Sequence, residues 1–521
     1  MGGQIALTGL DFAVGIPDLS EGGKVQGHFQ GQPLVAVRRG ETYFALAASC
    51  THWGENLADG AVIGDTIRCG GHHACFSLST GEASCPPALG PLQTYKVELR
   101  AGGRVVVGPR DPAPARVRNV ATDPVSVVII GGGAAGSAAA DVLRREGYAG
   151  PVTIISADSD LPCDRPNVSK DYLAGGAPEE WLFLRDAAAW QAAKIDVKLG
   201  TPVGAIDREA RTVRLSTGET LSYGALLLAS GAEAIRLPIP GAELPHVHVL
   251  RTVADARRIV ANAASAQKAV VVGASFIGME AAASLRARGL EVCVVAPDAV
   301  PFSKALGPIA GGVLKAAHKR AGVKFKLGRR PASISASGVT LDDGSVVSAD
   351  LVVLGVGVRP SLGLAEAAGL AIDRGVTVDA QLRTSDEHIW AAGDIARYPD
   401  VRGGGPVRIE HWVVAQRQGQ HAARAMLGQT GGFKAVPFFW TTQFGVTLRY
   451  AGHAESWDRI DLSGDPSQGD CAFAYRLAGR TLAVVTYGRQ QASLEAEDAL
   501  ERGDEAALAR LVPPSLNGSL S

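Results

Sequence analysis

Short apolar segments separated by turn residues make up the first part of the chain. Gly, Asp and Pro bound them, as is typical of short antiparallel strands. The segments lie at 34–37, 43–47, 95–99 and 105–107. We therefore predict a small antiparallel β domain over residues 1–108. The Pro-rich stretch that follows predicts a semi-rigid linker over 109–122.

After the linker the pattern changes to apolar strands that alternate with Ala-rich helices. Such alternation indicates an α/β fold. Two similar units of strand, Gly-rich turn and helix, at 125–145 and 268–289, predict two Rossmann-like nucleotide-binding domains. Strand-like segments then return over 432–521, where we predict a C-terminal α+β domain that closes with an acidic helix over 494–511.

Composition narrows the class of protein. A chain of 521 residues is too long for one hydrophobic core. Its net charge of −1 makes neither nucleic acid nor an anionic membrane surface an expected partner. The N-terminus lacks a basic segment followed by an apolar one, and no apolar run approaches the ~20 residues of a spanning helix. We expect a cytoplasmic protein with no membrane span.

Two Cys/His pairs carry the strongest chemical signal, Cys50-Thr-His52 and Cys69-Gly-Gly-His72. In a Rieske [2Fe–2S] cluster two thiolates bind one iron and two imidazoles bind the other, so each loop would supply one ligand to each iron. Zinc also accepts two Cys and two His, but the Cys-x-His arm is shorter than the usual zinc spacings. We predict these four residues as metal ligands, with His73 as a rival for His72.

The run from Cys50 to Glu82 resembles soluble, ferredoxin-type Rieske domains, in which a glycine usually stands at the position of His73. Cys75 and Cys85 occupy no ligand position of that family, and we interpret them as small buried hydrophobic residues. The odd number of cysteines, seven in all, argues against a disulfide framework.

The first glycine fingerprint follows the apolar strand 127–130 and opens a helix. Gly131 permits a tight turn, Gly133 lets the backbone approach a pyrophosphate, and Gly136 lets helix and strand pack closely. Ala135 lies in the same turn and is a further cofactor-binding candidate. Asp158, just after the next strand, is the candidate for the adenosine ribose.

The second fingerprint reads Gly273-Ala-Ser275-Phe-Ile-Gly278. The serine at the second glycine position narrows the approach to the pyrophosphate, which weakens the fingerprint without removing it. Asp298 stands near the end of the next strand, and no arginine follows at once. An acid there accepts the ribose hydroxyls, so we expect NADH to be favoured over NADPH.

Further motifs complete the pattern: Leu-Pro-Cys-Asp-Arg-Pro-Asn-Val-Ser-Lys at 161–170, Leu-Leu-Leu-Ala-Ser-Gly at 226–231 and Ile-Trp-Ala-Ala-Gly-Asp at 389–394. With the fingerprints they resemble the two-dinucleotide-binding-domain flavoproteins, in their apoptosis-inducing-factor-like and ferredoxin reductase branch, and specifically its Rieske-containing members. The resemblance implies an FAD-binding domain made of 123–252 and 382–431 and an NAD(P)H-binding domain over 253–381.

The same resemblance implies individual site residues. Lys170 and Glu280 are expected at the reaction centre, since a cation beside the ring stabilises reduced flavin. The remaining residues that it places near FAD or the nicotinamide are Arg165, Ser230, Gly231, Gly357, Asp394, Trp412 and Trp440.

The expected function is electron transfer from NAD(P)H. Flavin takes electrons in pairs and releases them singly, whereas a [2Fe–2S] centre takes one at a time, so NAD(P)H, FAD and cluster form a coherent relay. The expected partner is an acceptor protein such as an oxygenase, and a homodimer is among the expected assemblies. Two alternatives stay open: an NADH-responsive redox sensor of apoptosis-inducing-factor type, and a flavin peroxidase that uses Cys163.

Overall fold

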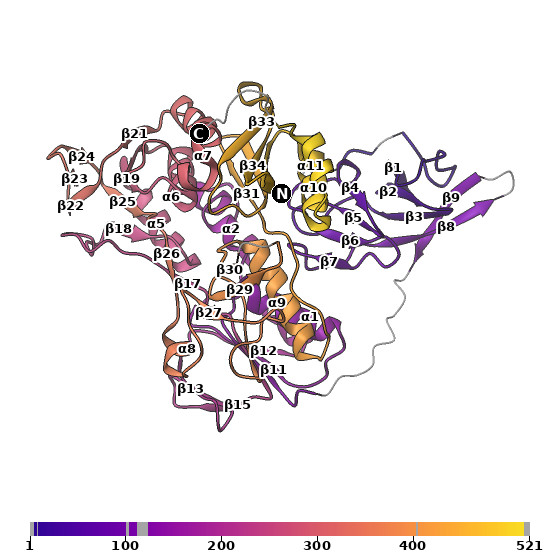
Figure 1. Ribbon diagram of the computed structural model, residues 1–521, viewed down its shortest axis with the longest axis horizontal. Helices are drawn as coiled ribbons and strands as arrows, with labels where there is room; N and C mark the ends of the chain where they lie inside the picture. Colours follow the sequence, from indigo (N-terminus) through magenta and orange to yellow (C-terminus); the bar gives the residue numbers. More distant parts are fainter. Residues whose placement is uncertain (1–4, 8, 101–103, 112–122, 403–404, 515–521) are drawn as a thin grey trace.

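The structure is a computed structural model that describes residues 5–7, 9–100, 104–111, 123–402 and 405–514. Figure 1 shows four lobes, with the C-terminal domain (α10, α11 and the sheet containing β33 and β34) lying between the N-terminal β domain and the lobe that contains β19 and α6. Within these ranges, every helix is too short or too polar to cross a membrane.

Two antiparallel sheets build the N-terminal domain, with strand orders β1-β2-β3-β8-β9 and β4-β5-β6-β7. Their bounds are β1 Lys24–Phe29, β2 Gln32–Arg39, β3 Thr42–Ala47, β4 Ala61–Ile63, β5 Thr66–Arg68, β6 Cys75–Ser77, β7 Ala83–Cys85, β8 Thr94–Arg100 and β9 Arg104–Asp111. Because β9 runs to Asp111, residues 109–111 of the predicted linker are part of a strand. The rest of that linker, 112–122, lies outside the described residues.

The first α/β unit is a parallel sheet of order β12-β11-β10-β16-β28. Its strands are β10 Val127–Ile130, β11 Val152–Ile155, β12 Ile195–Lys198, β16 Ala225–Leu228 and β28 Ile389–Ala391, and its main helices are α1 Ala134–Arg145 and α9 Trp412–Met426. All residues of β10 and β16 are buried, as expected of strands covered on both faces. The chain leaves this sheet after β16 and returns for β28 and α9.

The second α/β unit has the parallel order β18-β25-β19-β20-β21. It comprises β18 Val247–Val249, β19 Lys268–Val272, β20 Glu291–Ala296, β21 Lys324–Leu327 and β25 Leu351–Leu354, with helices α5 Val253–Ala263, α6 Phe276–Ala287 and α7 Ser303–Arg320. Strand β18 belongs to this sheet although it precedes the expected domain boundary at residue 253. Its edge pairing with β25 is a long-range contact, which the local pattern does not reveal.

Smaller sheets surround these two units. They are built from β13 Val203–Asp207, β14 Thr212–Leu215, β15 Thr220–Ser222, β17 Ala232–Ala234, β22 Pro331–Ser335, β23 Gly338–Leu341, β24 Val346–Ser348, β26 Val358–Pro360, β27 Val376–Thr377, β29 Ala396–Asp400 and β30 Gly405–Val407. The pair β17 and β26 joins the two units, because one strand follows β16 and the other follows β25.

The C-terminal domain is an antiparallel sheet of order β31-β32-β35-β34-β33 with two helices. Its elements are β31 Phe438–Gln443, β32 Val446–Gly452, β33 Arg459–Asp465, β34 Asp470–Leu477, β35 Arg480–Tyr487, α10 Gln490–Arg502 and α11 Glu505–Leu511. The prediction of one helix over 494–511 was wrong. Gly503 adopts a left-handed conformation with φ 66°, and Asp504 then starts α11 by accepting a hydrogen bond from the Ala507 amide.

Close contact between α1 and α9 holds the first α/β unit together and depends on a glycine. A Cβ atom at Gly419 of α9 would lie 2.0 Å from the backbone oxygen of Ala135 in α1. A backbone oxygen cannot move aside to accommodate a new Cβ atom, as the end of a flexible side chain could. The two helices therefore approach closely only because residue 419 has no side chain.

We expect Gly419→Ala to destabilise this unit by about 1–3 kcal/mol through overpacking. The expected readouts are a lower thermal midpoint and earlier release of flavin. The matched control is Gly312→Ala in α7, where a Cβ atom meets nothing within 4 Å. That variant should keep or raise the midpoint, because alanine favours a helix by up to about 1 kcal/mol over glycine. Equal midpoints for both variants would contradict the packing argument.

Candidate redox site

The two predicted ligand loops share one backbone design. In the first, the Cys50 amide donates to the Glu55 carbonyl (2.8 Å) and the Gly54 amide donates to Cys50 (2.8 Å). In the second, the Cys69 amide donates to Ala74 (2.8 Å) and the His73 amide donates to Cys69 (3.0 Å). In both loops the cysteine amide donates to the carbonyl five residues later, and the cysteine carbonyl accepts from the amide four residues later. Each loop presents one thiol and one imidazole.

The loops bring like ligands together in pairs. The thiols of Cys50 and Cys69 influence each other: Cys50 lowers the pKa of Cys69, and Cys69 together with burial raises the pKa of Cys50. The Nδ1 atoms of His52 and His72 lie 3.1 Å apart. Two nitrogens on one metal ion, with bonds of about 2 Å and a tetrahedral angle, would be about 3.3 Å apart. The imidazole pair therefore has the spacing of two ligands of a single ion.

This arrangement fits a two-iron cluster better than zinc. A structural zinc needs four ligands at one point. A Rieske cluster needs two thiols at one iron and two imidazoles at the other, and this is the pairing that the loops present.

His73 does not compete for the cluster. It is fully buried, its Nδ1 lies 2.7 Å from Oε2 of Glu497, and its Nε2 lies 3.1 Å from Oγ of Ser493. Its ring stacks on Phe438 with centroids 3.7 Å apart. The backbone of His73 is left-handed, with φ 63°, which explains why a glycine usually stands there. Of the two candidates, the structure places His72 beside His52, whereas both ring nitrogens of His73 contact the C-terminal domain.

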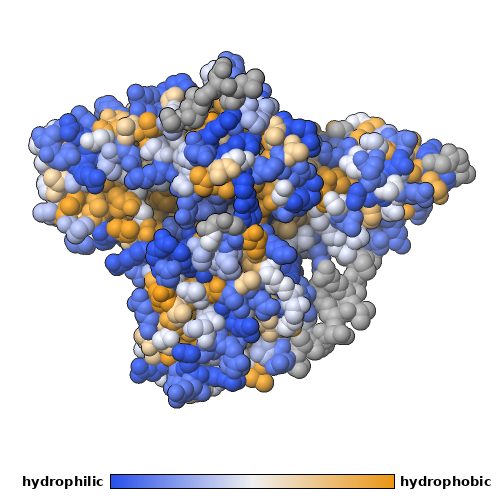
Figure 2. All heavy atoms as spheres, in the orientation of Figure 1, coloured by the Kyte–Doolittle hydropathy of each residue, from blue (hydrophilic) through white to orange (hydrophobic). Residues whose placement is uncertain are grey.

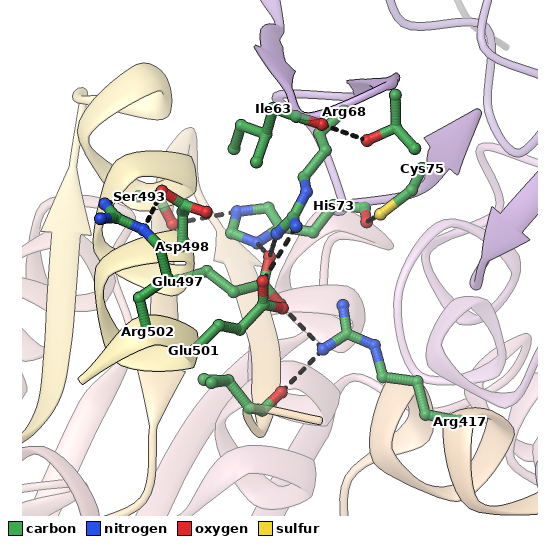
Figure 3. A network of polar contacts seen from close by, with 12 residues as sticks. Ile63, Arg68, His73, Cys75, Arg417, Ser493, Glu497, Asp498, Glu501 and Arg502 are labelled. Atoms are coloured by element: carbon green, nitrogen blue, oxygen red, sulfur yellow. Dashed lines mark hydrogen bonds and ion pairs between the residues drawn. The ribbon is translucent and has the colours of Figure 1, made fainter. Parts of the chain in front are cut away.

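Figure 3 shows the polar network that the His73 side chain joins. Glu497 of α10 is fully buried and lies 2.8 Å from Arg417 of α9 and 3.5 Å from Arg68 of β5. Burial alone would raise the pKa of Glu497, but Arg417 and His73 hold it well below its usual range. Arg68 also pairs with Glu501 at 2.9 Å. This network fastens the Rieske-like domain to the rest of the molecule.

The first fingerprint has the geometry of a dinucleotide loop. Gly131 has φ 112°, and a Cβ there would lie 2.1 Å from the Ala229 oxygen. A Cβ at Gly136 would lie 2.0 Å from the Gly131 oxygen, whereas one at Gly133 would enter open space. Only the second glycine faces a volume into which a phosphate could fit. Ala135 is buried in α1 and serves the packing against α9.

A cavity opens beside this loop. Gly133, Asp158, Cys163 and Arg165 are among its lining residues, and Arg165 Nη2 pairs with Asp158 Oδ2 at 2.8 Å. The donor loop, the acid and the cation are what the adenosine and pyrophosphate parts of FAD require. Burial raises the pKa of Cys163 to about 11, so its thiol is a poor nucleophile at neutral pH, which disfavours a peroxidase role.

Lys170 and Glu280 meet where three domains join. The Lys170 Nζ atom lies 2.9 Å from Oε2 of Glu280, and both side chains are largely buried. Ser169 Oγ donates to the same oxygen (2.6 Å), and Thr441 Oγ1 of β31 donates to the other (2.8 Å). Lys170 lies between α2 (Arg165–Val168) and α3 (Asp171–Ala174), while Glu280 belongs to α6. The structure thus brings the two predicted reaction-centre residues into direct contact.

The predicted cluster histidines face this junction. His52 Nε2 lies 3.3 Å from Oδ2 of Asp164, with both side chains about nine-tenths buried. The ring of His72 packs on Trp440 of β31 at 4.2 Å between centroids. Asp164 immediately precedes Arg165 of the cavity, and Trp440 immediately precedes Thr441, which bonds Glu280. The two predicted cluster histidines, His52 and His72, therefore contact residues that are adjacent in sequence to the predicted flavin site.

The other predicted flavin residues lie around the same unit. Asp394 pairs with Arg251 at 2.7 Å, a partner that the sequence did not suggest. Ser230 Oγ donates to the Ser361 carbonyl at 3.2 Å, and Gly231 accepts from the Ser361 amide at 3.0 Å. Trp412 begins α9 and is partly buried against the core of the first α/β unit.

The second fingerprint repeats the loop geometry of the first. Gly273 has φ 109° and a Cβ there would lie 2.2 Å from the Gly355 oxygen, while one at Gly278 would lie 2.3 Å from the Gly273 oxygen. Ser275 is exposed at the start of α6, and its hydroxyl makes no capping hydrogen bond. Gly357, with φ 105°, accepts from the Ile235 amide at 3.0 Å.

Asp298, the predicted ribose acid, lies outside the junction of the domains. It is partly exposed after β20 and pairs with the exposed Lys304 at 3.4 Å. The carboxylate is thus available at the surface of the second α/β unit.

Sequence reasoning missed the residues that join the Rieske-like domain to the reductase. Ser493 and Glu497 belong to no motif. Asp164 lies in the motif at 161–170, but its contact with His52, 112 positions away, was not predicted. One feature of the sequence could have indicated such contacts: His73 is a bulky residue at a position where a glycine is usual. A side chain in that conformation needs compensating contacts.

Comparison with known proteins places these parts in families. The chain matches the pyridine nucleotide-disulphide oxidoreductase family over residues 125–419, the Rieske [2Fe-2S] domain over 13–96 and the reductase C-terminal family over 438–517. It is 32% identical over 475 residues to apoptosis-inducing factor 3 of Homo sapiens, covering 88% of this chain and 78% of that protein.

Two bacterial reductases give similar matches. The ferredoxin–NAD(+) reductase component of the anthranilate 1,2-dioxygenase system of Burkholderia cepacia is 38% identical over 346 residues, which are 66% of this chain and 85% of that protein. The crystal structure of the covalent putidaredoxin reductase–putidaredoxin complex superposes with a TM-score of 0.70 at 32% identity, covering 73% of this chain and 93% of that chain.

We expect His72→Ala to abolish the Rieske EPR signal, because one iron loses a ligand. The bound iron should fall to about half of the wild-type content or less. Flavin absorbance should remain. The matched control is the neighbouring His73→Gln, which should keep the signal because His73 contacts Glu497 and not the cluster loops' ligands. Retention of the signal in His72→Ala, or its loss only in His73→Gln, would contradict the ligand set.

Proposed function

Because the chain belongs to the pyridine nucleotide-disulphide oxidoreductase family and carries a Rieske [2Fe–2S] domain before the family's core, we propose that it is an NAD(P)H-dependent reductase with an internal electron relay. Electrons pass from NAD(P)H through FAD to the chain's own cluster and then to an external acceptor. The observation that carries the proposal is the contact of both cluster histidines with the reductase, His52 with Asp164 and His72 with Trp440.

The two prosthetic groups are chemically suited to each other. Flavin supplies the exchange between electron pairs and single electrons, and histidine ligation gives a Rieske cluster a potential of about −150 to +300 mV. Such a potential favours transfer toward the cluster and an acceptor more oxidising than a low-potential ferredoxin. The likeness to a dioxygenase-system reductase component and to a putidaredoxin reductase supports an electron-transfer protein or an oxygenase as that acceptor.

The chain's own side chains hold the relay in place. Lys170 supplies positive charge beside the flavin site, and Glu280 fixes its Nζ atom at 2.9 Å. Asp164 accepts from Nε2 of His52, which leaves Nδ1 for iron and fixes the tautomer of the ring. Trp440 fills the space against His72 and keeps water from that contact. Together these residues keep the cluster edge dry and oriented toward the reductase.

We expect anaerobic mixing of the full-length protein with NADH to bleach the flavin first and to produce the Rieske EPR signal within one turnover. The measurement is stopped-flow absorbance combined with freeze-quench EPR. In the His72→Ala variant the flavin should still bleach and no signal should follow. If the wild-type flavin is reduced but the cluster signal never appears on the turnover timescale, the internal relay does not exist. A single slow reduction without turnover would instead indicate a sensor.

We also propose NADH as the preferred donor, with Asp298 accepting the ribose hydroxyls. The anthranilate-system relative is named a ferredoxin–NAD(+) reductase component, which supports this choice. Asp298→Ala should then lower the ratio of kcat/KM for NADH to that for NADPH by about tenfold, since a hydrogen bond to a charged group contributes about 1.5–3 kcal/mol. The control is Asp196→Ala on strand β12, an exposed acid of the other α/β unit. An unchanged ratio for Asp298→Ala would exclude the assignment.

A further inference from the structure

Two cysteines outside the predicted ligand set face each other in the Rieske-like domain. Cys75 of β6 and Cys85 of β7 are partners in an antiparallel pair, at the point where the register shifts before Phe76. Such partners have Cα atoms about 4.5–5.5 Å apart, which lies within the range of about 4.4–6.8 Å that a disulfide spans. Both cysteines are free, and each is the largest influence on the pKa of the other.

The surroundings make the two sulfurs unequal. Cys75 is buried, and its Sγ lies 3.5 Å from the His73 carbonyl, whereas Cys85 is only half-buried. The neighbouring Cys75, followed by the cations Arg417 and Arg68, lowers the pKa of Cys85. In turn, Cys85 and burial raise the pKa of Cys75. A more acidic thiol on a half-buried residue, beside a buried thiol that stays protonated, is the arrangement of an attacking and a resolving cysteine.

The remaining free cysteines lack these features. Burial raises the pKa values of Cys163 and Cys471 to about 11 and also raises that of Cys293. Cys50 and Cys69 are committed to the cluster loops. Among the described cysteines outside the cluster loops, Cys75 and Cys85 are therefore the pair that geometry favours for oxidation.

We propose that Cys75 and Cys85 form a reversible redox site that a peroxide oxidises to a cross-strand disulfide. The Cys85 thiolate attacks one oxygen of hydrogen peroxide, the O–O bond breaks, and the leaving hydroxide takes a proton to become water. Cys75 then attacks the sulfenic sulfur, the S–S bond forms, the S–O bond breaks, and a second water leaves. The two thiols lose two electrons and two protons, and the peroxide gains both.

The location gives the disulfide a structural consequence. Strand β6 begins just after the second ligand loop, whose Ala74 carbonyl accepts from the Cys69 amide at 2.8 Å. A bond from Cys75 to β7 would tie the end of that loop to the neighbouring strand. Oxidation would therefore brace the loop that carries Cys69 and His72.

The test uses the full-length, cluster-loaded protein, reduced, desalted without air and treated with one equivalent of hydrogen peroxide. After acid quenching and unfolding, all thiols are alkylated and counted by intact mass. The chain has seven cysteines, so we expect seven labels before oxidation and five after it. Peptide mapping should show Cys75 linked to Cys85, and dithiothreitol should restore seven labels. The Rieske EPR signal, recorded on separate aliquots after reduction of the cluster with dithionite, should be the same before and after peroxide.

Variants separate this pair from other thiols. Cys85→Ser should keep six labels after peroxide, whereas the matched control Cys293→Ala, in the second α/β unit, should fall from six to four. Seven labels in oxidised wild type would overturn the proposal. So would a link between Cys50 and Cys69 with loss of the EPR signal, or a loss of two labels in Cys85→Ser. The wild-type mapping decides the matter even if a variant fails to fold.

Discussion

The arrangement of the whole molecule depends on a buried carboxylate, Glu497 of α10. It lies within 2.8 Å of Arg417 from the first α/β unit and 2.7 Å of His73 from the Rieske domain, with Arg68 at 3.5 Å. A buried charge is tolerated only when its partners stay in place, and removal of one such partner costs about 3–5 kcal/mol. One residue of the C-terminal domain thus fixes two other domains relative to each other (Figure 3).

Docking by this network orients the cluster loops. Once His73 is fixed in the interface, the adjacent His72 lies against Trp440, and His52 comes within 3.3 Å of Asp164. The histidine edge therefore faces the reductase and not the solvent. Figure 2 shows the outer surface in the same orientation as Figure 1, where the Rieske lobe adjoins the C-terminal lobe and polar and apolar residues are mixed on the viewed face.

Local features of the site were predictable because they depend on neighbouring residues in the chain. The spacing within Cys50-Thr-His52 and Cys69-Gly-Gly-His72 determines which ligands one loop can present. The glycines of the two fingerprints are required by φ values above 100° at Gly131 and Gly273 and by backbone contacts near 2 Å. The helix over 494–511 was mispredicted for a local reason as well, since Gly503 ends α10.

The sequence by itself determined the parts: a Rieske-type ligand set, two dinucleotide folds and a C-terminal domain, each encoded by short-range spacing and hydrophobic period. Only the tertiary structure decided how the parts meet. His73 against Glu497 and His52 against Asp164 are contacts between segments far apart in the chain, and no local pattern specifies them. The physical reason is that buried polar groups are satisfied by whichever side chains packing brings near, and packing is a property of the complete fold.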